Sequence, residues 1–139
     1  MKVEKLTPNF SVSSINETVK FYQDVLGFSL IMAVPESQDG IEDTIAANKQ
    51  YVYALVAKDG IELMFQRSDT FHHDVTLVDQ KSIGATVSFY MEVSGVDDFY
   101  NRIKKHQVTI TEIKNAWYGM REFYLRDING YVIGIAEKV

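Results

Sequence analysis

The sequence contains no cysteine and only two prolines among 139 residues. Without cysteine the chain has no disulfides, no thiolate ligands for a metal and no cysteine nucleophile. Long apolar runs are also missing. The N-terminal residues do not resemble the core of a signal peptide, and no segment stays apolar over the length of a membrane-spanning helix. We therefore expect a cytoplasmic protein that does not use a membrane as its partner.

Positive charge is scarce as well, since 14 lysines and arginines stand against 19 aspartates and glutamates, for a net charge of −5. No basic cluster offsets this balance. Nucleic acid is therefore not an expected partner, because its phosphate backbone would be repelled. The sign of the charge is compatible with a neutral or cationic small-molecule ligand.

The first half of the chain has the pattern of one helix and four strands. Residues 5–12 alternate between polar and apolar, which predicts a half-buried strand. Ser14 followed by Glu17 is typical of a capping box and Gly27 of a helix C-terminus, so residues 14–26 are predicted to form an amphipathic helix. Three further strands are expected, and a tight turn at Lys58-Asp59-Gly60 joins the last two: 28–34, 51–57 and 61–66.

The second half repeats this order after a polar segment, residues 67–82, which we interpret as a linker. Ser94 is expected to cap a helix with Asp97 and Asp98 in its first turn. The segment Asp127-Ile128-Asn129-Gly130 predicts a type I′ hairpin turn. The expected strands are 85–93, 108–113, 121–126 and 131–136.

The predicted fold class is therefore α+β, with two tandem βαβββ modules. Residues 1–66 form the first module and residues 83–139 the second, within one domain that spans residues 1–139. An internal repeat of this kind usually means modules that complete a core together.

Two segments resemble a known superfamily. Residues 19–28 (VKFYQDVLGF) are similar to an FY-x-x-x-LGF segment that ends the first helix of its members, and residues 119–131 (GMREFYLRDINGY) resemble their R-x-F-Y-x-x-D-P-D-G hairpin, with Ile128 in place of proline. This superfamily is the vicinal-oxygen-chelate group of glyoxalases, bleomycin-resistance proteins and dioxygenases. The resemblance implies a curved, incomplete barrel with the site on its concave face, and a homodimer.

Many members of this superfamily hold a divalent metal with His, Gln or Glu side chains. The matching positions here are Thr7, Glu62, Ser88 and Gly134. Only Glu62 is a ligand of the usual type, and one carboxylate does not hold a transition metal that needs about three protein ligands. The chain thus resembles the metal-free, bleomycin-resistance-like members most, and no cofactor is expected.

Strand alternation together with the resemblance assigns side chains to a polar-aromatic cleft. Glu62 and Glu92 are carboxylates for a cationic group, or general bases if buried. Aromatic walls are expected from residues in the second module. The predicted ligand-binding residues are Thr7, Asn9, Glu62, Met64, Gln66, Ser88, Tyr90, Glu92, Trp117, Tyr118 and Tyr124.

Other polar groups have simpler interpretations. His72 and His73 lie in the expected linker, where neighbouring side chains point to opposite sides, so a solvated loop is favoured over a metal site. Arg121 and Arg126 are interpreted as members of charge pairs on a hairpin, with binding of an anionic ligand as the alternative.

Three functions stay open at this point. The first is a metal-independent protein that binds an organic, cationic or aromatic molecule. The second is a metal-dependent lyase or dioxygenase of glyoxalase type. The third is a regulatory or accessory module without catalysis, because a fold alone does not specify a function.

Overall fold

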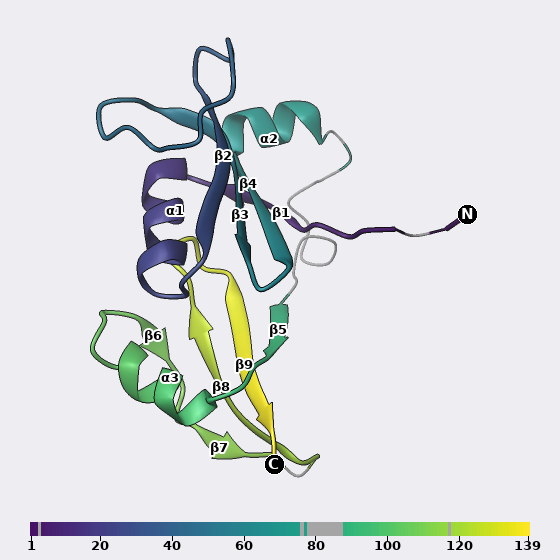
Figure 1. Cartoon of the computed structure of the whole chain (residues 1–139), viewed down its shortest axis with the longest axis vertical. Helices are drawn as coiled ribbons and strands as arrows, with labels where there is room; N and C mark the ends of the chain where they lie inside the picture. Colours follow the sequence, from purple (N-terminus) through teal and green to yellow (C-terminus); the bar gives the residue numbers. More distant parts are fainter. Residues whose placement is uncertain (3, 76, 78–87, 117) are drawn as a thin grey trace. The chain divides into compact units, whose positions relative to one another are not determined.

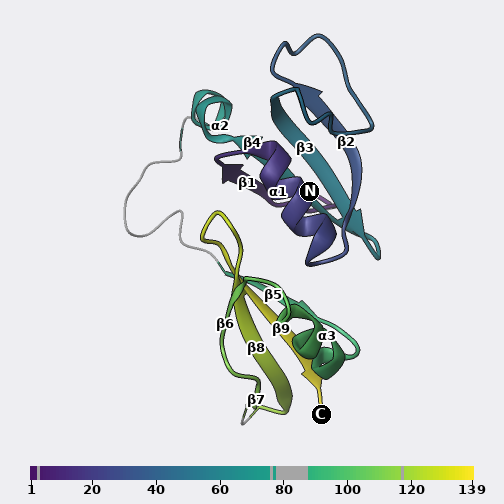
Figure 2. The same cartoon turned by 90° about the vertical axis from the view of Figure 1, so that its left-hand side faces the viewer.

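The computed structural model of the chain describes residues 1–2, 4–75, 77, 88–116 and 118–139 (Figure 1). The chain divides into two compact units, Met1–Asp79 and Gln80–Val139. Each unit has one open sheet and a helix on one of its faces (Figure 2). The predicted α+β class is confirmed. Within the described residues no helix has the length and apolar character needed to cross a membrane.

The sheet of the first unit has four strands in the order β1-β4-β3-β2. Its first and last strands, β1 and β4, run parallel, with Asn9 beside Met64 and Phe10 beside Phe65. The other two neighbouring pairs are antiparallel. The elements are β1 (Asn9–Val12), α1 (Ile15–Asp24), β2 (Ser29–Pro35), β3 (Tyr51–Lys58), β4 (Ile61–Arg67) and α2 (Ser68–Asp74).

Helix α1 forms where the capping signals predicted it. The Ser14 side chain accepts a hydrogen bond from the Glu17 backbone N–H, and Gly27 after the helix has φ +74°. Val19 and Tyr22 are buried, and the Tyr22 ring lies 4.6 Å from that of Phe65 between centroids. The apolar stripe of α1 thus covers one face of the sheet and leaves the other face open.

Two segments of this unit differ from the sequence prediction. Strand β1 begins at Asn9 rather than at Lys5. The expected linker contains helix α2, which has a single buried residue, Phe71, and therefore no apolar period to indicate it. The Ser68 hydroxyl donates to the Val12 carbonyl at 3.0 Å, so α2 is attached to the end of β1.

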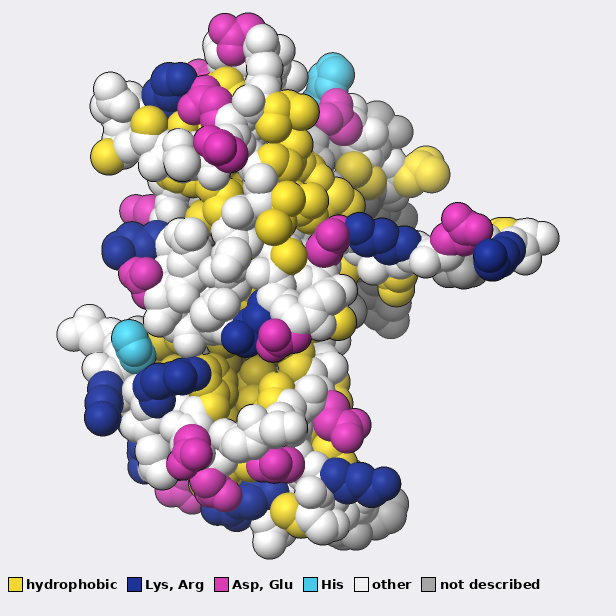
Figure 3. Space-filling model, in the orientation of Figure 1, with side chains coloured by type: hydrophobic (Ala, Val, Ile, Leu, Met, Phe, Trp, Pro, Cys, Tyr) yellow, Lys and Arg dark blue, Asp and Glu magenta, His cyan; other side chains and the backbone are white. Residues whose placement is uncertain are grey.

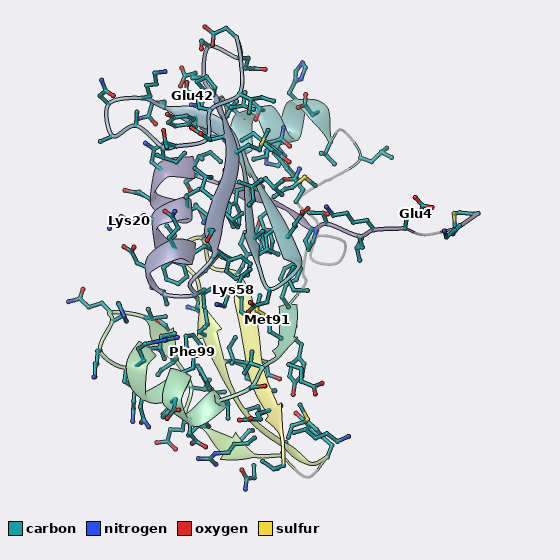
Figure 4. The ribbon with its side chains drawn as sticks, viewed as in Figure 1. Glu4, Lys20, Glu42, Lys58, Met91 and Phe99 are labelled. Carbon is teal, nitrogen blue, oxygen red and sulfur yellow. The ribbon has the colours of Figure 1, made fainter. Side chains whose placement is uncertain are left out.

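The long segment between β2 and β3 is held by Glu42 (Figure 4). Lys49 Nζ and the hydroxyl of the buried Tyr51 donate to its two carboxylate oxygens at 2.7 and 2.8 Å. These bonds lower the pKa of Glu42, the bond from Lys49 most. The connection between β2 and β3 is therefore fixed by contacts of one carboxylate.

The second unit has the sheet order β5-β9-β8-β6, with β7 also paired to β8. Its first and last strands are parallel again, with Tyr90 beside Gly134. Of the strand predicted over residues 108–113, only Thr109–Ile110 pairs with a neighbouring strand, which is β8. The elements are β5 (Ser88–Glu92), α3 (Val96–Ile103), β6 (Thr109–Ile110), β7 (Lys114–Asn115), β8 (Met120–Arg126) and β9 (Val132–Lys138).

The predicted cap of α3 is wrong. The N-cap residue is Gly95 rather than Ser94, and no side chain of the cap residue bonds to the helix. Instead the carboxylate of Glu137, on β9, accepts the backbone N–H groups of Gly95 and Val96, both at 3.0 Å. A long-range carboxylate thus satisfies the free donors of the first turn, where negative charge is favourable.

The predicted type I′ turn of the second hairpin is also wrong. That turn needs φ > 0 at both central residues, but in this segment only Gly130 has a positive φ, +91°. Ile128 is β-branched and resists positive φ. The Asp127 side chain holds the turn by accepting the N–H groups of Asn129 and Tyr131, at 2.8 and 2.9 Å. By contrast, the tight turn predicted at Lys58-Asp59-Gly60 forms, with positive φ at both Asp59 and Gly60.

Replacement of Glu137 by alanine is expected to lower the melting temperature by several degrees, because two helix N–H groups lose their acceptor. Both bonds lower the pKa of Glu137. The stabilisation is therefore complete above the ordinary glutamate pKa of about 4.3 and is lost as the pH falls through the lower value of the folded protein. Thermal unfolding followed by circular dichroism over an acidic pH series measures this.

The control is Glu112→Ala, which removes an exposed carboxylate between β6 and β7. Equal melting temperatures for the two variants at neutral pH would contradict the capping role of Glu137.

Candidate functional site

The open face of the first unit has a line of amide and carboxylate groups. Asn9 Nδ2 donates to Gln66 Oε1 at 2.9 Å, and Gln66 Nε2 donates to Asp74 Oδ2 at 2.8 Å. The Asn9 Oδ1 atom is buried and has no hydrogen-bond partner among the residues that the structure describes. Met64 and Leu55 lie beside this line on the same face. The arrangement offers an acceptor to a donor group of a ligand.

Glu62 lies on the same face, two residues before Met64. Its carboxylate forms an ion pair with Lys5 Nζ, and its side chain is 29% exposed. Tyr53 has a raised pKa, first through burial and then through the charge of Glu62. The carboxylate that the resemblance puts at a metal position thus already has a cationic partner in its own unit.

The open face of the second unit has a cluster of tyrosines around a buried carboxylate. Tyr90 Oη donates to Glu122 Oε2 at 2.6 Å, and Tyr118 Oη donates to Glu122 Oε1 at 2.5 Å. Glu122 is 3% exposed, whereas Tyr90 and Tyr118 are each 48% exposed. Each oxygen of the Glu122 carboxylate therefore accepts a hydrogen bond from a phenol that is partly exposed to solvent.

Gly134 lies beneath the rings of Tyr90 and Tyr124. A Cβ atom at Gly134 would lie 2.7 Å from Tyr90 Cδ2 and 2.9 Å from Tyr124 Cε1, closer than carbon atoms approach. Tyr90 and Tyr124 flank Gly134 on the neighbouring strands, and their ring centroids are 6.5 Å apart. Only glycine leaves room for both rings. We call Tyr90, Tyr118 and Tyr124 over Gly134 the tyrosine surface.

The protons of this cluster stay on the phenols. The hydrogen bonds from Tyr118 and Tyr90 lower the pKa of Glu122 against the effect of its burial. The bond to Glu122 raises the pKa of Tyr118 to about 12 and also raises the pKa of Tyr90. At neutral pH the cluster therefore consists of one carboxylate and neutral phenols. On the face shown in Figure 3, acidic and basic side chains are interspersed.

The predicted site residues fall into two groups, one in each unit. Asn9, Met64 and Gln66 lie together on the first sheet, with Glu62 beside them. Tyr90, Tyr118 and Tyr124 form the tyrosine surface, while Ser88 and Glu92 are exposed on β5. Thr7 precedes β1, and Trp117 lies outside the described residues. The ligand-binding role of these residues stays a prediction.

Sequence reasoning missed Glu122, which occupied the variable position of the hairpin motif. A signal was available, because Met120, Glu122 and Tyr124 share one face of a strand by alternation. The missing information was that β9 lies between β8 and β5 and brings Tyr90 to the same place.

The remaining polar candidates have structural partners or are exposed. Arg121 donates to Asp97 from Nε and Nη2, at 2.8 and 2.7 Å, which joins β8 to the first turn of α3. His72 and His73 are exposed, and they lie on α2 rather than in a loop. In the described ranges, no three histidine, aspartate or glutamate side chains gather as metal ligands would.

The substitution Gly134→Ala is expected to destabilise the protein by about 1–3 kcal/mol, the usual range for overpacking. The added methyl group would push Tyr90 or Tyr124 away from its place. Urea unfolding followed by circular dichroism measures the change. Gly40→Ala is the matched control, since a Cβ there has no atom within 4 Å and the backbone φ is ordinary. Equal stability of the two variants would contradict the close packing over Gly134.

The substitution Glu122→Gln is expected to bring the pKa of Tyr118 from about 12 down toward the ordinary tyrosine value, about 10. The neutral amide no longer stabilises the protonated phenols. Carbon-13 NMR of the labelled phenol carbons measures this over the alkaline range in which the protein stays folded. Tyr53 serves as an internal control and should not change. Unchanged ionisation of Tyr90 and Tyr118 would show that the charge of Glu122 does not act on them.

A sequence model of the Glyoxalase/Bleomycin resistance protein/Dioxygenase superfamily matches residues 7–135. The chain is also similar to a bleomycin resistance protein of Geobacillus stearothermophilus and to one of Staphylococcus aureus, in each case with 26% identity over 134 residues and 95% of both chains covered.

Solved structures agree on the fold. TioX from Micromonospora sp. ML1 matches with a TM-score of 0.72 and 17% identity, over 99% of this chain and 100% of the other. TnmS3, an antibiotic binding protein from Streptomyces sp. CB03234, matches with a TM-score of 0.65 and 19% identity, over 100% and 99%. The family match spans nearly the whole chain, and the protein therefore belongs to the glyoxalase/bleomycin resistance protein/dioxygenase superfamily.

Proposed function

We propose that this protein binds a small organic molecule, of the kind represented by natural-product antibiotics, reversibly and without a metal held by the protein. One observation carries the proposal. At the position where the superfamily resemblance puts the fourth metal ligand, the chain has Gly134, and two tyrosine rings fill the space above it. A ligand-binding surface of aromatic character thus replaces a metal-binding side chain.

The other three metal positions support the same proposal. Thr7 and Ser88 have neutral hydroxyls, which are weak ligands for the transition metals of this superfamily. The carboxylate of Glu62 is paired with Lys5. A divalent metal would have to displace that lysine and would then gain a single strong protein ligand, whereas such sites use about three.

The exposed aromatic surface supports an organic ligand. Tyrosine side chains combine a large apolar ring with a polar end, and they are common where small molecules bind. Tyr90 and Tyr118 are each about half exposed to solvent. The names of two similar proteins, a bleomycin resistance protein and an antibiotic binding protein, point to ligands of the same class. The proposal includes a cytoplasmic homodimer, which size-exclusion chromatography with light scattering tests.

Metal content is the first test. After dialysis against Zn²⁺, Ni²⁺, Fe²⁺ or Mn²⁺ and removal of free metal, elemental analysis of the purified protein is expected to find far less than one ion per chain. The physical reason is the lack of a second and third strong ligand. Near-stoichiometric metal that disappears in the Glu62→Ala variant would overturn the proposal and favour a metal-dependent lyase or dioxygenase.

Ligand binding is the second test, with metal-free bleomycin and a panel of aromatic antibiotics as probes. Isothermal titration is expected to find saturable binding for at least one of them. The affinity should fall by about tenfold or more when both Tyr90 and Tyr118 are replaced by alanine, because stacked rings contribute about 0.5–1.5 kcal/mol each beyond their buried area. An unchanged affinity in this double variant would show that the ligand binds away from the tyrosine surface.

A further inference from the structure

The tyrosine surface differs from an ordinary exposed aromatic patch because a buried negative charge lies directly behind it. Glu122 accepts one hydrogen bond on each oxygen, from Tyr90 at 2.6 Å and from Tyr118 at 2.5 Å. A phenol that donates to an anion gains electron density in its ring. The faces of these two rings are therefore more negative than those of tyrosines hydrogen-bonded to water, and cations bind to such faces.

Among the described residues, no lysine or arginine forms a salt bridge with Glu122. Lys114 is its partner in the β7–β8 register and acts on it only as a charge at longer range. Arg121, the next residue along β8, pairs with Asp97. The negative potential is thus directed outward through the phenols.

Two of the rings are also held in place by the sheet beneath them. Tyr90 and Tyr124 meet at an angle of 52° over Gly134, where the missing side chain lets both rings approach the backbone. Tyr90 and Glu122 are held in register by β9, which pairs with both of their strands. The surface is thereby set in place before a ligand arrives, which reduces the entropy lost on binding.

We propose that the tyrosine surface binds the positively charged, flat part of an organic ligand, such as an aromatic ring with a quaternary or protonated nitrogen. Tyr90, Tyr118 and Tyr124 contact the cation through their ring faces. Glu122 is a positioning residue, which orients two of the rings and raises their electron density without touching the ligand. This inference rests on the proposed function and names the ligand class of that site.

A set of related probes tests the preference for a cation. The probes are 10-methylacridinium, which has a permanent positive charge, acridine, which is neutral at mildly alkaline pH, and acridine-9-carboxylate, which is an anion. Isothermal titration of the full chain is expected to find about tenfold tighter binding of 10-methylacridinium than of acridine, in line with a desolvated cation on aromatic faces. Acridine-9-carboxylate should bind with the lowest affinity of the three probes. Equal affinities for the cation and for acridine would overturn the proposal.

Two carboxylate variants separate the local effect from net charge. In Glu122→Gln the preference for the cation is expected to fall to within about twofold, while the affinity for acridine is retained. Glu137→Gln removes the same charge from the same unit, but Glu137 caps α3 and, by alternation along β9, lies on the opposite face of the sheet from Gly134. It should keep the full preference. If both variants lost the preference for the cation equally, the effect would be due to net charge, and the role of Glu122 would be overturned.

The wild-type protein supplies a measurement that does not depend on folding of a variant. In NMR spectra with labelled tyrosines, 10-methylacridinium is expected to shift the ring resonances of Tyr90, Tyr118 and Tyr124 and to leave Tyr53 unchanged. Unshifted resonances of the three tyrosines, as expected if another part of the protein or a second copy covers them, would overturn the proposal. Circular dichroism melting establishes that each variant is folded.

The two proposals fail in different ways. Absence of antibiotic binding, or a bound metal, contradicts the proposed function whatever the acridine probes do. Antibiotic binding that persists without any preference for the cationic probe contradicts only the assignment of ligand class.

Discussion

Parallel pairing between the first and last strand of each unit is the constraint on which the rest of the structure depends. It places β1 beside β4 and β5 beside β9, so that residues far apart in the chain become neighbours. Because side chains alternate along a strand, this pairing also decides which residues share a face. In each sheet one face packs against a helix, and the other collects the polar and aromatic side chains.

The pairing has its sharpest consequence at Gly134. The register places Tyr90 on one side of this glycine and Tyr124 on the other. Glu122 stands two residues before Tyr124 on β8. It is buried, and its carboxylate accepts a hydrogen bond from the hydroxyl of Tyr90. Burial of a carboxylate is costly unless its oxygens are hydrogen-bonded. The two phenols meet that requirement, and this explains why a charged side chain is tolerated there.

At the four positions where the superfamily resemblance puts metal ligands, this chain has two hydroxyl groups, one carboxylate and a glycine. Membership of the superfamily does not choose between binding and catalysis, since function depends on the residues of the site. The tyrosine surface and the amide line of Asn9 and Gln66 are the features by which this chain can be compared with other members.

The sequence by itself determined those parts of the protein that depend on local physical chemistry. Ser14 and Glu17 predicted the start of α1 because capping is a contact between near neighbours, and Gly27 predicted its end through its positive φ. Period-two alternation predicted the strands and placed Tyr90 and Tyr124 in the candidate site. The two family motifs predicted the superfamily, since together they cover both units.

Only the tertiary structure decided the contacts between residues that are distant in sequence. Nothing near Gly95 indicates that Glu137 caps the following helix, because the acceptor comes from the last strand. Helix α2 depends on one buried residue, Phe71, and on a bond to the end of β1. Glu122 looks like a surface residue in the sequence. It becomes the centre of the tyrosine surface only when the sheet brings two phenols to its carboxylate, and no local pattern encodes that meeting.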